Sequence, residues 1–78
     1  MGFFRMQGRI DKVVHSHGFG FIRTDDGREV LFHRADLLEL NFHSLREGQK
    51  VDFELPRRME DVPRAIIVRP IRARRFSY

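Results

Sequence analysis

A two-residue alternation of apolar and polar side chains recurs along most of this 78-residue chain. Such alternation is typical of β-strands that bury one face and expose the other. The segments that we predict as strands span residues 6–14, 19–24, 29–33, 51–55 and 63–70. Five short strands without a long helix, in so small a chain, predict an all-β fold in which an antiparallel sheet closes into a barrel.

The absence of cysteine limits how this chain can be stabilised. Neither a disulfide nor a thiolate zinc site can hold the fold, and the length is near the lower limit for a single hydrophobic core. The core must therefore come from closing the sheet. No apolar run reaches the ~20 residues that a membrane span needs, and residues 1–5 are too short for a signal peptide. We expect one cytoplasmic domain.

The predicted second strand contains two aromatic residues on one face. Because successive side chains of a strand point to opposite faces, Phe19 and Phe21 lie together, and Gly20 and Ile22 lie opposite. The two rings are either core residues of a hairpin or an exposed platform on which bases stack. Stacking of one base on an aromatic ring contributes about 1–3 kcal/mol and accepts any base. The spacing alone favours neither alternative.

The next strand decides between them. A turn at residues 25–28, in which Gly27 supplies a positive φ, brings this strand antiparallel to the second one. Val30 and Phe32 look like the core face, which leaves Leu31 and His33 outside. His33 then lies beside the two phenylalanines on one contiguous aromatic surface, although His33 by itself would be no more than an ordinary exposed histidine. The pair of strands therefore favours the platform.

The net charge of +4 is confined to the end of the sequence. Residues 1–68 contain equal numbers of basic and acidic side chains, so the excess comes from Arg69, Arg72, Arg74 and Arg75. A charge-balanced domain with a basic tail indicates a polyanionic partner only weakly, since solvated termini are often charged.

Several short motifs, in order, resemble the cold-shock domain family. Residues 18–22, Gly-Phe-Gly-Phe-Ile, resemble its first ribonucleoprotein motif, with His17 where lysine is usual. Residues 30–33, Val-Leu-Phe-His, stand where the second motif is expected, and residues 42–51 and 63–65 resemble later segments. The resemblance implies a five-stranded antiparallel oligonucleotide-binding (OB) fold over residues 6–70. Residues 1–5 would be a short extension and residues 71–78 a basic tail.

The resemblance also implies binding of single-stranded RNA or DNA on the face of the first three strands. Carried over by position, the stacking residues are Phe19, Phe21, His33 and Phe42. This chain departs from the family where aromatic residues are usual, at Lys12, Val13, Leu31 and Arg34. Fewer rings and more cations predict a weaker and more electrostatic binder. The nucleic-acid-binding residues expected on these grounds are Lys12, His17, Phe19, Phe21, Leu31, His33, Arg34 and Phe42.

Other classes of function have less support in the sequence. His15 and His17 lie two residues apart in a loop, and His33 would have to join them to make a metal site. Without cysteine or a paired carboxylate set, we expect no catalytic residues, no metal, no cofactor and no small-molecule substrate. The alternative is a protein-interaction or homodimerisation module on an OB fold whose nucleic-acid face is degenerate. We expect a monomer rather than a dimer, with no membrane contact.

Overall fold

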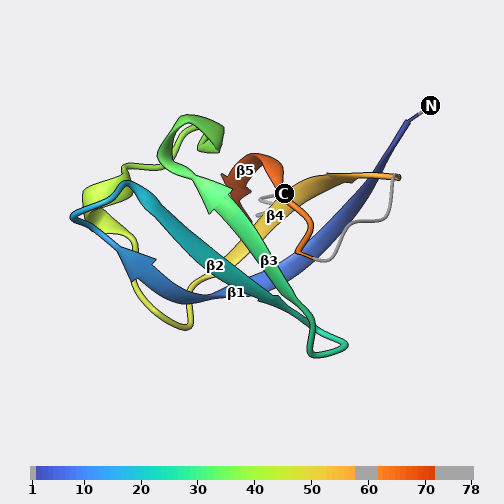
Figure 1. Cartoon of the computed structure of the whole chain (residues 1–78), viewed down its shortest axis with the longest axis horizontal. Helices are drawn as coiled ribbons and strands as arrows, with labels where there is room; N and C mark the ends of the chain where they lie inside the picture. Colours follow the sequence, from blue (N-terminus) through green and yellow to red (C-terminus); the bar gives the residue numbers. More distant parts are fainter. Residues whose placement is uncertain (1, 58–61, 72–78) are drawn as a thin grey trace, which may run out of the picture.

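The computed structural model describes residues 2–57 and 62–71, which form one five-stranded antiparallel sheet (Figure 1). The strands follow the order β3-β2-β1-β4-β5 across the sheet. Two short 3-10 helices, η1 and η2, lie between β3 and β4 in the sequence. The elements are β1 Phe3–Val14, β2 Phe19–Thr24, β3 Glu29–His33, η1 Arg34–Asp36, η2 Phe42–Ser44, β4 Lys50–Pro56 and β5 Ile66–Pro70. The predicted all-β class is confirmed.

The period-two pattern produces the core of the sheet. Every second residue of β2, β3 and β4 is buried, as the alternation predicts. Val30 and Phe32 are completely buried, and Phe53 is 1% exposed. The buried apolar cluster consists of Ile10, Ile22, Val30, Phe32, Phe42, Leu45, Val51, Phe53, Leu55, Ala65 and Val68. The opposite face of β2 and β3 is consequently free to carry other side chains.

The first strand is longer than the sequence predicts. It begins at Phe3 instead of residue 6, because β4 continues to Pro56 and offers backbone partners to the earlier residues. Phe3 lies opposite Pro56, and Phe4 lies opposite Leu55. Residues 3–5, expected as part of a separate extension, therefore belong to the sheet. Of the expected basic tail at 71–78, only Ile71 lies within the described residues.

The predicted closed barrel needs a correction, because no continuous ladder joins the two edge strands. The edges meet through isolated parallel bridges, Leu31 with Arg64 and Leu37 with Val68. Leu31 donates its N–H to the Pro63 carbonyl at 2.9 Å and accepts from the Ala65 N–H at 2.7 Å. Pro63 has no N–H to donate, so the ladder cannot extend through it. The sheet curls round the core without closing completely.

The segment between β3 and β4 is mostly irregular. Its regular elements are the two short 3-10 helices η1 and η2. The side chain of Asn41 caps η2 by accepting the His43 N–H at 2.9 Å. Among the described residues, no helix is long and apolar enough to cross a membrane.

Candidate nucleic-acid interface

The outer face of β1, β2 and β3 brings five of the predicted site residues together. The register places Phe19 beside His33 and Phe21 beside Leu31, while Lys12 of β1 flanks Phe21. Lys12 is exposed and the other four side chains are half-buried. The rings of Phe19 and Phe21 meet edge to face, with centroids 5.9 Å apart and planes at 90°. We call Lys12, Phe19, Phe21, Leu31 and His33 the aromatic face.

Gly20 fixes which face of β2 points outward. A Cβ atom at this position would lie 2.5 Å from the Lys12 carbonyl oxygen and 2.7 Å from the Phe32 ring. No side chain fits there, so the backbone of β2 lies directly on the core at this point. Phe19 and Phe21, on either side of Gly20, consequently project to the outer surface.

A β-bulge in β1 determines which residue accompanies Phe21. The pairing of β1 with β2 runs from Arg9 with Arg23 to Ile10 with Ile22, and then shifts so that Lys12 lies opposite Phe21. Without the shift, Asp11 would take that place. A bulge inserts one extra residue and redirects the side chains that follow it. Here it places an ammonium group beside the ring in place of a carboxylate.

Two further predicted residues, His17 and Arg34, lie at the loop end of the aromatic face. The ring of His17 is 6.3 Å from that of Phe19, and its Nδ1 is 2.9 Å from the Ser16 hydroxyl. Arg34 donates its backbone N–H to the Gly18 carbonyl at 2.9 Å, which joins η1 to the β1–β2 loop. Both side chains are exposed. They add a guanidinium group and an imidazole ring to this border of the face.

Phe42 does not take the position that the resemblance implies. Its side chain is only 4% exposed and belongs to the core cluster, so no ring face is open to a base. The exposed rings beside it are His15, at 5.4 Å, and His43, at 5.9 Å, and the Arg34 guanidinium lies 5.7 Å from its centroid. These three side chains therefore pack on the buried Phe42 ring.

His15 and His43 are therefore surface residues that the sequence did not identify. Their rings are nearly parallel, with an interplanar angle of 11° and centroids 6.3 Å apart. They come from the β1–β2 loop and from η2, which are far apart in the sequence. No local sequence pattern links the two histidines, so the sequence does not reveal the pairing. All four histidines of the chain thus lie at the loop end.

The ion pair between Asp36 and Arg64 holds His33 in place. The carboxylate of Asp36, whose side chain is 8% exposed, accepts the His33 backbone N–H at 2.8 Å. The same carboxylate accepts two hydrogen bonds from the Arg64 guanidinium, at 2.9 and 3.0 Å. These bonds raise the pKa of Arg64 further above its ordinary value. The charge of Arg64 is consequently neutralised within the protein.

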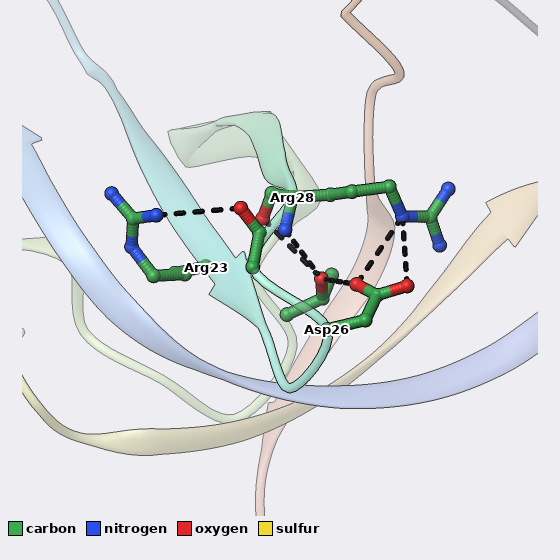
Figure 2. A network of polar contacts seen from close by, with 5 residues as sticks. Arg23, Asp26 and Arg28 are labelled. Atoms are coloured by element: carbon green, nitrogen blue, oxygen red, sulfur yellow. Dashed lines mark hydrogen bonds and ion pairs between the residues drawn. The ribbon is translucent and has the colours of Figure 1, made fainter.

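Carboxylates surround the opposite end of the aromatic face. Arg23 follows Phe21 on the same face of β2, and its guanidinium forms an ion pair with Glu29 at 2.7 Å (Figure 2). The same guanidinium lies 3.5 Å from Asp11. The contact with Glu29 is an ion pair that lacks hydrogen-bond geometry. Burial, followed by the proximity of Asp11, raises the pKa of Glu29 above its usual range. A single guanidinium can neutralise only one of the two carboxylates, so the cluster of Arg23, Glu29 and Asp11 keeps a net negative charge.

The β2–β3 turn next to this ion cluster is rigidly hydrogen-bonded (Figure 2). Gly27 has φ of 90°, and the Thr24 hydroxyl donates to the Asp26 carboxylate and accepts the Arg28 N–H at 3.0 Å. The hydrogen bond from Thr24, together with the Arg28 guanidinium at 3.2 Å, lowers the pKa of Asp26. The turn therefore fixes the register that aligns Phe21 with Leu31.

The three histidines considered as metal ligands do not converge. His15 lies against Phe42 and His43, whereas His17 contacts Phe19, and His33 is part of β3. Within residues 2–57 and 62–71, no group of three potential ligands is placed to hold a metal ion.

Comparison with known families identifies the fold and its class of function. The model of the 'Cold-shock' DNA-binding domain matches residues 6–71. The chain belongs to the cold-shock domain family. It is 40% identical over 50 residues to the cold shock-like protein CspC of Bacillus cereus, covering 64% of this chain and 77% of that protein. It is also 39% identical over 49 residues to the major cold shock protein of Streptococcus pyogenes serotype M6, covering 63% of this chain and 73% of that protein.

A solved structure supports the same fold. Drosophila Unr CSD456 superimposes with a TM-score of 0.71 at 23% identity, covering 95% of this chain and 29% of that chain. At this identity the likeness concerns the fold alone. The solved structure supports the OB-type sheet, and the family model supports nucleic-acid binding as the class of function.

Proposed function

We propose that this cold-shock domain binds single-stranded RNA or DNA on its aromatic face and keeps the strand from pairing. Bases stack on Phe19 and Phe21, with His33 and Leu31 completing the apolar contact. A base that stacks on a protein ring no longer stacks on its neighbouring bases. The domain therefore opposes secondary structure in RNA without a catalytic step.

The exposure of Phe19 and Phe21 is the observation that carries this proposal. Phe32 and Phe53, the other phenylalanines in the middle of the sheet, are 0% and 1% exposed. Phe19 and Phe21 remain partly exposed although leaving an aromatic ring in water is unfavourable. Their edge-to-face contact keeps both rings in place before a ligand arrives. Such preorganised rings lose little conformational entropy when a base stacks on them.

Positively and negatively charged side chains lie at opposite ends of the aromatic face. Lys12, His17 and Arg34 border its middle and its loop end, where phosphate groups gain from cations. The ion cluster of Arg23, Asp11 and Glu29 at the other end has a carboxylate in excess and repels phosphate. We infer that the sugar–phosphate backbone follows the loop side of the face, where Lys12, His17 and Arg34 lie.

The basic tail is a separate part of the proposal, because Arg72, Arg74 and Arg75 lie outside the described residues. Its charge, read from the sequence, would add attraction that does not depend on base sequence. The stacking surface itself lies within one copy of the chain, so a monomer is sufficient for binding. Soluble action in the cytoplasm and the absence of a small-molecule substrate complete the proposed function.

A comparison of single- and double-stranded ligands tests this function. Fluorescence anisotropy of a labelled pyrimidine oligonucleotide should report binding of the single strand and much weaker binding of the same sequence as a duplex. Sedimentation with and without the oligonucleotide should give a complex containing nucleic acid. A protein that binds neither form but self-associates through Phe19, Phe21 and Leu31 would contradict the proposal and would support a protein-interaction module.

A further inference from the structure

The start of β1 has an unpaired edge. The pairing of β1 with β2 begins at Gly8, whereas its pairing with β4 extends back to Phe3. Residues 3–7 consequently have a strand on one side only, among the residues that the structure describes. Figure 1 shows this part of β1 (dark blue) continuing beyond β2 with only β4 alongside it.

The backbone polar groups of this edge alternate in direction. Arg57 donates its N–H to the Gly2 carbonyl, and Ile10 donates to the Gln49 carbonyl, so the even-numbered residues of β1 bond toward β4. In an antiparallel strand the intervening residues point their N–H and C=O groups the other way. Phe3, Arg5 and Gln7 therefore direct theirs to the unpaired side. Only another extended backbone offers donors and acceptors at this spacing.

The side chains on this edge are unusually apolar. Phe3 is 54% exposed and Phe4 is 46% exposed. The guanidinium of Arg57 lies 4.5 Å from the centroid of the Phe4 ring. A soluble protein normally protects a free edge with a short strand, charges or proline. Here, among residues 3–7, Arg5 is the charged residue, and its Nε bonds to Asp52 of β4 at 3.2 Å.

The occupant that this edge fits best is the same edge of a second copy. Because the odd-numbered residues must bond to each other, and because β2 already pairs with β1 from Gly8 onward, a two-fold axis passes opposite Phe3, Phe4 or Arg5. An axis at Arg5 sets two guanidinium groups opposite each other, which is unfavourable. An axis at Phe4 sets Phe3 opposite Arg5 of the copy and makes Phe4 face Phe4 in a non-hydrogen-bonded pair, where side chains are closest. An axis at Phe3 pairs fewer residues.

We propose that two copies of this chain associate antiparallel through residues 3–5 of β1, with Phe4 of each copy in contact. The two sheets then continue as β4-β1-β1-β4 across the axis, and each Phe4 ring contacts the other ring as well as Arg57. So short a pairing buries far less than the roughly 1,200–2,000 Å² of a standard interface, so the dimer is transient and depends on concentration. This surface is separate from the aromatic face.

Single-cysteine variants test the register, since the chain has no cysteine of its own. A non-hydrogen-bonded antiparallel pair holds its Cα atoms about 4.5 Å apart, within the range of about 4.4–6.8 Å that a disulfide spans. Phe4→Cys should therefore form a disulfide-linked dimer under mild oxidation at high protein concentration. Gln7→Cys is the matched control and should stay monomeric. Equal linking of both variants, or faster linking of Arg5→Cys, would overturn the proposal.

Sedimentation equilibrium of the unmodified chain supplies an independent measurement. The weight-average mass should rise from 9.3 kDa toward twice that value with concentration. Arg5→Pro should abolish the rise while keeping the melting temperature of Arg5→Ala, because the Arg5 N–H has no role in pairing with β4. Arg5→Ala, which loses the same ion pair with Asp52, should still associate. Two results would refute the proposed dimer. One is a weight-average mass of the unmodified protein that stays at the value for a single chain at every concentration, and the other is equal association of Arg5→Pro and Arg5→Ala.

Discussion

Replacing Phe19 or Phe21 by alanine should weaken single-strand binding without unfolding the protein. Each ring is partly exposed and offers a base one stacking contact, which contributes about 1–3 kcal/mol. The dissociation constant should therefore rise by about 5- to 150-fold for each variant, at 1.4 kcal/mol per tenfold. Because the chain contains no tryptophan, anisotropy of a labelled oligonucleotide is the suitable assay.

The double variant adds a sharper test of the same reasoning. The two rings contact each other edge to face at 5.9 Å, so each single change also removes support from the other ring. Aromatic pairs of this kind contribute about 0.5–1.5 kcal/mol. The double variant should consequently lose less affinity than the sum of the two single losses.

Buried phenylalanines serve as the matched controls. Phe32→Ala and Phe53→Ala should lower the free energy of unfolding by about 3–5 kcal/mol, because both side chains are in the core. If Phe19→Ala or Phe21→Ala destabilises the fold by as much, the rings are structural and the assignment of the aromatic face is wrong. Unchanged affinity in a stably folded Phe19→Ala, Phe21→Ala double variant would refute stacking directly.

Two further predictions concern charge. Because the pKa of Glu29 is raised in the folded protein, the free energy of unfolding should fall as the pH rises through 4.5, the ordinary pKa of glutamate, and above it. Glu29→Gln should remove this fall and should melt at a higher temperature than the unmodified protein at pH 7, as measured by thermal unfolding. Deleting residues 71–78 should reduce the slope of log K against log salt by about 0.7 per lost phosphate contact, with unchanged base preference.

The sheet could be predicted because its strands follow a single physical rule. Alternation predicted β2 and β3 with their observed bounds, and it separated Val30 and Phe32, which are buried, from Leu31 and His33. The rule depends only on residues two apart, so it holds without knowledge of distant contacts. The family resemblance supplied the topology, which alternation alone does not determine.

The departures from prediction all depend on contacts between distant residues. Strand β1 extends to Phe3 only because β4 continues to Pro56, and Lys12 reaches the outer face only through a bulge in its pairing with β2. Phe42 follows the family's motif, but its ring is packed into the core under His15. None of these outcomes has a pattern in the neighbouring sequence.

Ring-current shifts in an NMR titration test the central claim, that bases stack on the aromatic face. The ring protons of Phe19 and Phe21 should move upfield as a single-stranded pyrimidine oligonucleotide is added. Signals of the amides of Lys12, Leu31 and His33 should change with the same dissociation constant, while those of Phe4 and of β5 should stay in place. Binding that shifts β4 and β5 and leaves both rings unaffected would contradict the account.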